Sequence, residues 1–420
     1  MIFPYLFWSN SSDVHSTSDS PISLSHSESP RRSLTQFKSV FVGLLLTLIS
    51  LILYLGGEFS SLKQGQNSSE TQNFIFIPNV PGPEDMAIDF KHEFLYISSD
   101  PRRSVLKGGP ELGEIYVINL QDLIPTPLPL TLLDEEKHLI TQFFHPHGFD
   151  FLIHEGKGYL SIVNHHLGTL GALHGSQTIE KEIKHSIDVF EINSLSDPTT
   201  LTRVSQFTSP LLSSPNDVVA LSPSEFYVTN DHGSTSKVGR LFETLTQRSW
   251  GSLLYGKQGH WKTAYEGIAF ANGVEISADH KTVFVASANG DGLLVLEHSD
   301  PNKNVPQSQS QQEHGQLKQK ERIKIQGALD NLSWNQEQTH LWLTLHPRPL
   351  RFLLHSKSPS IHSPTEVICL KWDLKNRGVS SFKTVLGKGM PVSGGSITVE
   401  SHKALWVGNV FEEGIWKYVK

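Results

Sequence analysis

Several features that would mark a common class of protein are missing from this chain of 420 residues. Cysteine occurs once, at Cys369, so an internal disulfide cannot form and no cysteine-rich zinc motif is possible. The sequence also has no Gly-x-Ser-x-Gly nucleophile elbow, no His-Glu-x-x-His zinc motif and no phosphate-binding glycine loop. These absences disfavour a serine hydrolase, a zinc protease and a nucleotide-binding protein.

Charge is scarce as well. Charged residues make up 18% of the chain, the formal net charge is -7 and the pI is near 6.3. Proteins that bind nucleic acid favour basic patches, so no nucleic-acid partner is expected. Glycine (32) and proline (23) are plentiful, which is typical of many short strands joined by turns.

The only long apolar run lies near the N-terminus. Residues 1–38 are rich in serine and polar residues, and we expect them to form a disordered tail. Val40–Leu55 is uncharged and follows Arg31, Arg32 and Lys38. We therefore expect a transmembrane signal anchor over residues 39–57, followed by a linker over residues 58–78.

The positive flank of this run predicts the sidedness of the protein. Basic residues on the N-terminal side place the tail in the cytosol and the bulk of the chain in the lumen or outside the cell. A cleaved signal peptide, and thus a secreted protein, is the alternative. Asn67 begins an Asn-Ser-Ser sequence beyond the run and is a candidate glycosylation site.

The remainder of the chain repeats one pattern six times. Each copy is a polar or glycine pair, an alternating apolar segment, a polar turn and a second apolar strand with a central aromatic residue. The aromatic residues are Tyr96, Tyr159, Tyr227, Phe284, Trp342 and Trp406, which gives intervals of 63, 68, 57, 58 and 64 residues by subtraction. Each pair of segments predicts a β-hairpin, and a further strand candidate follows each pair.

Six repeated sheets of about four strands predict an all-β fold, a six-bladed β-propeller over residues 79–420. A pair of β-sandwiches would not require a sixfold repeat of one hairpin. Residues 301–322 are rich in Gln, Ser and Lys and are expected to be a disordered insert between strands. A second polar insertion is expected at residues 174–185.

Five of the six copies begin with oxygen-bearing or imidazole side chains at one position. The distance to the following aromatic residue is 12, 12, 11, 12 and 12 residues for Glu84, His147, Asn216, Asn272 and Asp330. Innermost strands of a propeller line a central channel, so these side chains should converge with their neighbours Asp85, Asp217 and Asn331. Oxygen ligands from several directions favour Ca²⁺. The alternative is that these residues only form turns.

Two histidines are candidates for proton transfer, because imidazole titrates near neutral pH. His147 lies at the ligand position of the second copy, and His165 follows the aromatic strand of the same copy. His346 has a similar place after the fifth aromatic strand. Asn331-Leu332-Ser333 also matches a glycosylation sequence, but a residue inside the channel could not be modified.

The motifs together resemble those of the paraoxonase, or serum arylesterase, family over residues 80–420. The matching segments are GPEDMAID, HPHGFDF, IVNHH, SPNDVVALSPSEFYVTNDHG, EGIAFANGVEISADHKTVFVA, LDNLSW and LHP. The disulfide that joins the first and last strands in that family has no counterpart here, so the ring would have to close by strand pairing. The loops 232–266 and 347–363 match only loosely.

The resemblance implies two calcium ions in the channel. The catalytic ion would be held by Glu84, Asn216, Asn272, Asp330 and Asn331. The structural ion would be held by Asp85, Asp217 and the backbone carbonyl of Phe149. The resemblance further implies a His147–His165 dyad, with His346 and Phe270 in the substrate pocket.

The function expected from this resemblance is calcium-dependent hydrolysis of lactones and aryl esters. A carbonyl polarised by the metal would be attacked by water that a histidine activates. Two alternatives remain at this point: a gluconolactonase-like lactonase with a single metal, and a non-catalytic, membrane-anchored propeller used as an interaction module.

Overall fold

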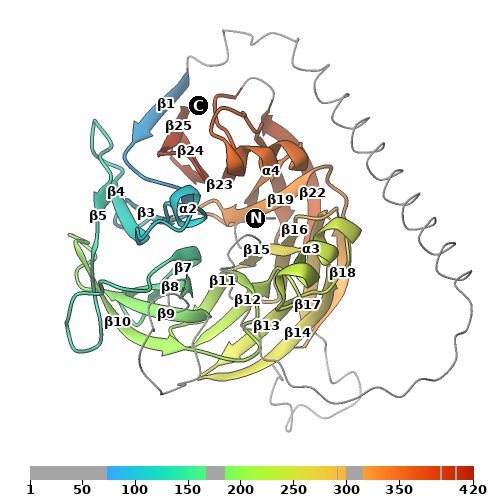
Figure 1. Cartoon of the computed structure of the whole chain (residues 1–420), viewed down its shortest axis with the longest axis horizontal. Coiled ribbons are helices and arrows are strands. Elements are labelled where there is room, and N and C mark those ends of the chain that lie inside the picture. The colour runs from blue at the N-terminus through green and yellow to red at the C-terminus, as the bar shows by residue number, and fades with distance from the viewer. Residues whose placement is uncertain (1–72, 167–184, 291, 299–315, 388–389, 403) are drawn as a thin grey trace, which may run out of the picture. The chain divides into compact units, whose positions relative to one another are not determined.

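The computed structural model describes residues 73–166, 185–290, 292–298, 316–387, 390–402 and 404–420. Six sheets of mainly antiparallel strands are arranged in a ring (Figure 1), which confirms the predicted all-β, six-bladed propeller. The expected tail, anchor (39–57) and Asn67 lie outside the described residues. Within the described ranges, no helix is long and apolar enough to cross a membrane.

The strands of each blade follow one another outward from the channel. The innermost strands are β2 (Pro83–Asp89), β7 (Pro146–His154), β11 (Pro215–Ser222), β15 (Ala271–Ile276), β19 (Ala328–Trp334) and β23 (Gly395–Ser401). The second strands are β3 (Phe94–Ser99), β8 (Lys157–His165), β12 (Glu225–Asn230), β16 (Thr282–Ser287), β20 (His340–His346) and β24 (Ala404–Asn409). These pairs are the six predicted hairpins.

The outer strands complete the blades, which we number one to six after the order of their innermost strands. The third strands are β4 (Glu114–Asn119), β9 (His185–Ile192), β13 (Gly251–Lys257), β17 (Gly292–His298), β21 (Glu366–Asp373) and β25 (Gly414–Val419). The fourth strands are β5 (Leu128–Pro129), β10 (Thr200–Phe207), β14 (His260–Ile268), β18 (Leu317–Ile323), β22 (Gly378–Leu386) and β1 (Phe74–Pro78), and β6 (Thr131–Leu133) pairs with β10.

Two of these strands fall where no strand was expected. β18 occupies the end of the segment expected to be a disordered insert, residues 301–322, whose residues 301–315 lie outside the described ranges. β1 falls within the segment expected to be a linker. Strand β1 pairs antiparallel with β25, in the register Phe74↔Tyr418 to Pro78↔Gly414.

This pairing closes the ring. The N-terminal strand of the propeller completes the blade that the C-terminal strands begin, and Cys369 is buried and free. Closure by strand pairing, without a disulfide, agrees with the prediction. The innermost strands also contact one another in ring order, from β2 through β7, β11, β15 and β19 to β23 and back to β2.

Hydrophobic packing between blades forms the core. Tyr96 of blade one packs with Phe149, Leu160 and Phe190 of blade two. An equivalent cluster lies at each of the remaining boundaries between neighbouring blades. The aromatic residues that reveal the repeat are buried in these clusters, apart from the half-buried Tyr159. Their recurrence in the sequence therefore reflects recurrence of one interblade contact.

The innermost strand of every blade is bulged near its start. The register with the second strand shifts after Pro83, Pro146, Pro215, Ala271, Leu329 and Gly395. A bulge breaks the regular alternation of side chains and turns an extra residue toward a new direction. The residues in these bulges include Glu84, His147, Asn216, Asn272 and Asp330, the ones predicted to face the channel.

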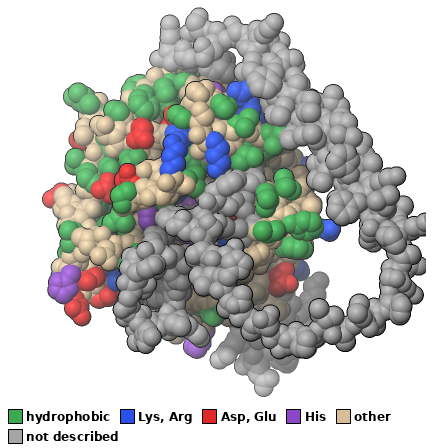
Figure 2. All heavy atoms as spheres, in the orientation of Figure 1, with side chains coloured by type: hydrophobic (Ala, Val, Ile, Leu, Met, Phe, Trp, Pro, Cys, Tyr) green, Lys and Arg blue, Asp and Glu red, His purple; other side chains and the backbone are tan. Residues whose placement is uncertain are grey.

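Three helices that the sequence analysis did not predict follow second strands. They are α2 (Arg102–Val105), α3 (Lys237–Thr246) and α4 (Pro349–Lys357). A second strand ends where its innermost partner begins, so all three helices lie at the bulged end of the channel. Hydrophobic side chains of α3 are exposed on the face seen in Figure 2; they are Val238, Leu241, Phe242 and Leu245.

Candidate metal centre and active site

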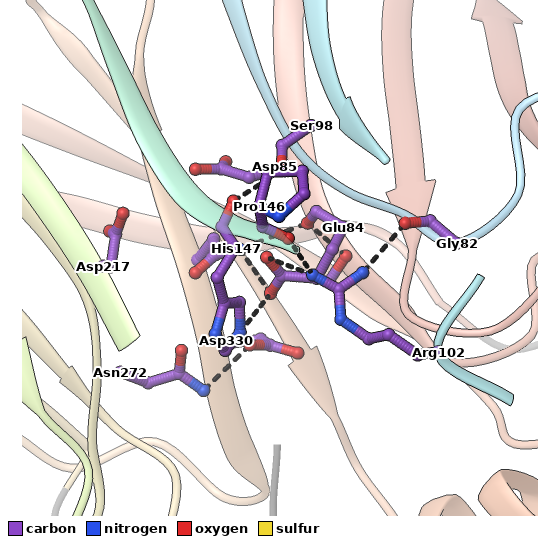
Figure 3. A network of polar contacts seen from close by, with 12 residues as sticks. Gly82, Glu84, Asp85, Ser98, Arg102, Pro146, His147, Asp217, Asn272 and Asp330 are labelled. Atoms are coloured by element: carbon purple, nitrogen blue, oxygen red, sulfur yellow. Dashed lines mark hydrogen bonds and ion pairs between the residues drawn. The ribbon is translucent and has the colours of Figure 1, made fainter. Parts of the chain in front are cut away.

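The predicted channel residues meet at the axis of the propeller. Glu84, His147, Asn272 and Asp330 point toward one common space from four different blades (Figure 3). All of the predicted ligand side chains, and both histidines of the predicted dyad, are at most 4% exposed. The alternative that these residues merely form surface turns does not fit this burial.

Amide groups hold the two carboxylates that lie nearest the bulged end. Asn331 Nδ2 donates to Glu84 Oε1 at 3.0 Å, and Asn272 Nδ2 donates to Asp330 Oδ1 at 2.8 Å. His346 Nε2 lies 2.8 Å from Asp330 Oδ2. Each carboxylate is thereby fixed by side chains from other strands or blades, which sets the direction of its remaining lone pairs.

Several buried oxygens in this group have no hydrogen-bond partner among the described residues. They are Glu84 Oε2, Asn216 Oδ1, Asn272 Oδ1 and Asn331 Oδ1. A buried polar atom without a partner costs about 1–3 kcal/mol, so a cluster of such oxygens indicates a missing positive partner. Carboxylate and amide oxygens are the ligands that Ca²⁺ prefers, and the predicted catalytic ion therefore fits these residues.

Burial also changes the pKa values of the two carboxyl groups. Burial raises the pKa of Glu84 to about 7, and the charge of Asp330 adds to this effect against the opposing charge of Arg102. Burial acts in the same direction on Asp330, but its contacts with His346 and Asn272 oppose this effect, and the pKa of Asp330 is lowered. Without a cation, one carboxyl of the pair tends to be protonated and the other ionised.

A second pair of carboxylates lies deeper in the channel. Asp85 accepts hydrogen bonds from the backbone N–H groups of Phe149 (2.9 Å) and Met86 (2.8 Å). Asp217 accepts them from Val218 and Val274, both at 2.7 Å. Residue 149 is thus beside Asp85, as the predicted structural ion requires, although Phe149 contacts Asp85 through its N–H and not through its carbonyl.

The deeper pair is strongly desolvated. Burial raises the pKa of Asp85 well above its usual value, and the charge of Asp217 raises it further. Burial likewise raises the pKa of Asp217, although two backbone N–H groups oppose the effect. Asp150 and Glu275 line the same cavity of about 150 Å³ together with these residues. The channel is therefore acidic beyond the predicted ligands.

Two glycines let neighbouring blades approach one another at the site. A Cβ atom on Gly148 would lie 2.3 Å from Asp217 Oδ1, and one on Gly273 would lie 2.7 Å from the Cα of Asn331. Each glycine follows a bulged residue that faces the channel. The dipeptides His147-Gly148 and Asn272-Gly273 thus supply a side chain to the site and leave room for the next strand.

The two histidines of the predicted dyad are in direct contact. His147 Nδ1 lies 2.8 Å from His165 Nε2, and His147 Nε2 lies 3.7 Å from Glu84 Oε1. Within the described part of the chain, His147 Nε2 has no hydrogen-bond partner. Burial lowers the pKa of both imidazoles well below the usual value, so both are neutral and able to accept a proton.

An apolar wall stands beside these polar groups. His346 stacks on Phe352 of α4, with ring centroids 3.8 Å apart, and Phe352 clusters with Phe270 and Phe411. The predicted pocket residues His346 and Phe270 therefore belong to one wall at the bulged end. Phe352 and Phe411 were not predicted. Phe352 lies in the loop 347–363, which matches the family pattern loosely, and Phe411 follows β24 in a segment that no motif marks.

Arg102 is the main residue of the site that sequence reasoning missed. Its side chain is 2% exposed and donates to the carbonyls of Gly82 and Pro146, both at 2.9 Å (Figure 3). Its Nη2 lies 3.8 Å from Glu84 Oε2. The only signal in the sequence is a pair of arginines directly after a strand end, which is usually a solvated pair.

Among the described residues, no three His, Cys, Asp or Glu side chains converge in a way that could hold a metal ion. The predicted ligands include three asparagines and a backbone carbonyl, and each ion would have only two carboxylates. The fit to a cation rests on the unpartnered oxygens described above.

Comparison with known proteins identifies the family of this chain. The family model described as Arylesterase matches residues 109–418. Serum paraoxonase/arylesterase 2 of Rattus norvegicus is 26% identical over 274 residues, which is 65% of this chain and 68% of the relative. Serum paraoxonase/lactonase 3 of Homo sapiens is 24% identical over 385 residues, which is 88% of this chain and 98% of the relative. Among solved structures, the calcium-binding protein regucalcin of Agrobacterium tumefaciens gives a TM-score of 0.43 at 12% identity, covering 82% of this chain and 93% of that one.

Proposed function

Because this chain belongs to the arylesterase family, we propose that it is a calcium-dependent hydrolase of lactones and aryl esters. The observation that best supports the proposal concerns atoms in one channel: buried oxygens and an imidazole nitrogen there have no hydrogen-bond partner in the part of the chain that the structure describes. The first group fits a cation, and the second fits a base. Relatives named paraoxonase, arylesterase and lactonase favour esters and lactones as the substrate class.

Calcium would be held by oxygens of Glu84, Asn216, Asn272, Asp330 and Asn331. When bound, it supplies polarisation of the substrate carbonyl and stabilisation of the negative charge that develops on the oxygen. Asn331 and Asn272 fix the two carboxylates by their amide groups, and His346 fixes Asp330 from the other side. These contacts hold the ligand oxygens in place before substrate arrives.

His147 is the proposed general base. A water molecule near Nε2 of His147 loses a proton to that nitrogen while its oxygen attacks the carbonyl carbon. The bond from that carbon to the ring or aryloxy oxygen then breaks. The leaving oxygen takes up the second proton of the water, so the products are a carboxylate and an alcohol or phenol, and the first proton is left on His147. His165 holds the tautomer of His147 through the contact with Nδ1.

The apolar wall selects the substrate. Phe270, Phe352 and Phe411 stand at the bulged end of the channel, where they would contact the hydrocarbon part of a lactone or the ring of an aryl ester. They also keep bulk water from the reacting carbonyl, which strengthens electrostatic interactions in the site. Lactones are the first expectation and aryl esters the second.

A substrate screen tests the proposal. Purified protein should hydrolyse lactones or aryl esters in the presence of calcium and lose this activity in a chelator. His147→Gln should lower turnover by about 10²-fold, which is the range of a general base, while calcium remains bound. His166→Gln removes a nearby histidine outside the dyad and serves as the control. Activity that persists in the chelator, or full activity of His147→Gln, contradicts the mechanism.

The number of ions separates the two-ion site from a single-metal lactonase. The deeper carboxylates Asp85 and Asp217 support a second ion, so metal analysis should find two calcium ions per chain. Asp217→Asn should reduce the number to one.

Membrane attachment remains part of the proposal. Residues 39–57 would anchor the chain, with the propeller in the lumen or outside the cell and Asn67 carrying a glycan. Alkaline extraction of membranes and a protease-protection assay test this placement, and release of the protein by alkaline carbonate would contradict the anchor.

A further inference from the structure

We propose that His185 is the third member of a proton relay that leads from the buried base His147, through His165, to solvent. The inference rests on the proposed hydrolase function and adds a residue that neither the sequence pattern nor the family motifs include. His185 is the first residue of β9, the third strand of blade two.

Three imidazole rings form an unbroken series. His147 Nδ1 lies 2.8 Å from His165 Nε2, and His165 Nδ1 lies 2.8 Å from His185 Nδ1. The ring centroids are 5.0 Å and 4.9 Å apart. His165 and His185 are also register partners across β8 and β9. The sheet itself therefore places the third ring beside the second.

The ring nitrogens allow one consistent direction of transfer. If His147 Nε2 is the base, its proton lies on Nδ1 and is donated to His165 Nε2. His165 then has its own proton on Nδ1 and donates it to His185 Nδ1, which leaves the proton of His185 on Nε2. Each ring thus accepts at one nitrogen and donates from the other, as proton transfer along a chain requires.

Exposure increases along the series. His147 is 2% exposed and His165 is 3% exposed, whereas His185 is half-buried. A proton taken up by His147 Nε2 can pass along the three rings, and each ring then has its proton on the other nitrogen. Reorientation of the rings restores their starting tautomers. The proton on His185 leaves to solvent or buffer.

The reaction needs such an exit. Hydrolysis of a lactone adds water, breaks the ring C–O bond and yields a hydroxy acid, which ionises near neutral pH. One proton therefore has to leave a buried site in every turnover. Glu84 and Asp330 are the proposed metal ligands, and they cannot hold this proton while a cation is bound.

Neighbouring histidines do not offer the same path. His145 Nδ1 pairs with Asp100 Oδ1 at 3.1 Å, and His166 Nε2 pairs with the hydroxyl of Ser186 at 2.9 Å. Neither contact includes a ring of the His147–His165 dyad. His166 is a matched control, because it is half-buried and lies beside the relay in sequence and in space.

The experiment compares the full-length protein with His185→Ala, His166→Ala and His147→Gln. Lactone hydrolysis is followed by product chromatography in a dilute, bulky buffer, with and without added imidazole. His185→Ala should lower turnover at saturating substrate about tenfold, less than loss of the base itself, with an unchanged KM and an unchanged calcium content. Imidazole, a small proton carrier, should restore most of the loss. His166→Ala should match the wild type, and imidazole should not restore His147→Gln.

Nitrogen NMR of ¹⁵N-histidine-labelled protein gives a readout independent of turnover. The wild type should show the proton of His165 on Nδ1, and His185→Ala should change the signal of this nitrogen. Full turnover of His185→Ala in the dilute buffer would overturn the relay, and so would a loss that imidazole does not restore. Wild-type protein that hydrolyses no lactone or ester would instead overturn the proposed function.

Discussion

In calcium-free protein, the free energy of unfolding of the propeller should decrease as the pH rises from 5.5 to 8. Burial raises the pKa of Glu84 from 4.5 in the unfolded chain to about 7. Between these two values the folded protein binds a proton that the unfolded chain does not bind, so the free energy of unfolding decreases with increasing pH. A bound cation replaces the proton and should remove this dependence.

The expected magnitude follows from the shift. A pKa change from 4.5 to about 7 corresponds to about 3 kcal/mol, of which about 2 kcal/mol lies between pH 5.5 and 8. A propeller of this size unfolds with an entropy of about 0.7 kcal/mol per kelvin. Glu84 alone should therefore lower Tm by about 3 °C over this range, and the raised pKa values of Asp85 and Asp217 act in the same direction.

Scanning calorimetry at both pH values, on metal-free protein and after addition of calcium, measures the effect. Glu84→Gln removes the titrating group and should remove about 3 °C of the pH dependence, whereas Glu266→Gln, at an exposed position of β14, should not change it. An equal Tm at pH 5.5 and pH 8 in metal-free protein would refute the reasoning. A calcium-induced rise in Tm that is no larger at pH 8 than at pH 5.5 would refute it too.

Three further outcomes are expected. Asn272→Ala should weaken calcium binding in calorimetric titration, and an unaltered affinity would contradict the ligand assignment. Gly273→Ala should disturb calcium binding and lower Tm, because the added Cβ would lie 2.7 Å from the Cα of Asn331 in the next blade. Gly378→Ala is the control and should be tolerated, because its Cβ would meet only the carbonyl oxygen of Asn376, at 3.9 Å. Ile77→Ala in β1 should lower the free energy of unfolding, measured with denaturant, by about 2–4 kcal/mol. Ile75 is 49% exposed in the same strand, so Ile75→Ala should change this free energy by about 0.5 kcal/mol or less. Equal effects of the two substitutions would show that β1 does not seal the ring.

The fold was predictable because one interblade contact recurs. Each blade needs an aromatic or large apolar residue in its second strand to fill the gap to its neighbour, and this need leaves a regular trace in the sequence. The residues at the start of each innermost strand were predictable for the same reason, since a constant distance from the aromatic residue means a constant position in the blade. Thus Glu84 and Asp330 could be aligned although they are far apart in the chain.

The parts that escaped prediction depend on contacts between segments with no repeat. The bulges are not visible in the hydrophobic pattern, because a bulged residue that faces the channel looks like any polar residue at a strand start. Arg102 enters the site from a short helix after β3, and its partners are backbone carbonyls that no sequence motif marks. His185 contacts His165 only because β8 and β9 pair in one particular register.

The predicted glycosylation sequence at Asn331 shows how the repeat resolves an ambiguous motif. Asn331 is 1% exposed, and its amide nitrogen donates to Glu84, so the nitrogen that would carry the glycan is inaccessible in the folded protein. Peptide mapping should find this asparagine unmodified.

Ring closure by β1 also determines the order in which the blades can form during synthesis of the chain. Phe74 leaves the ribosome long before Tyr418, its register partner, is made, and at 5–20 residues per second the delay is on the order of tens of seconds. During this time β1 has no native neighbour, and a strand with free N–H and C=O groups is a template for pairing with other chains. Blades one to five can form as the chain emerges, but the sixth forms only after β25 has emerged. A nascent chain is therefore vulnerable to aggregation until β25 emerges, and binding of β1 by a chaperone would protect it until then.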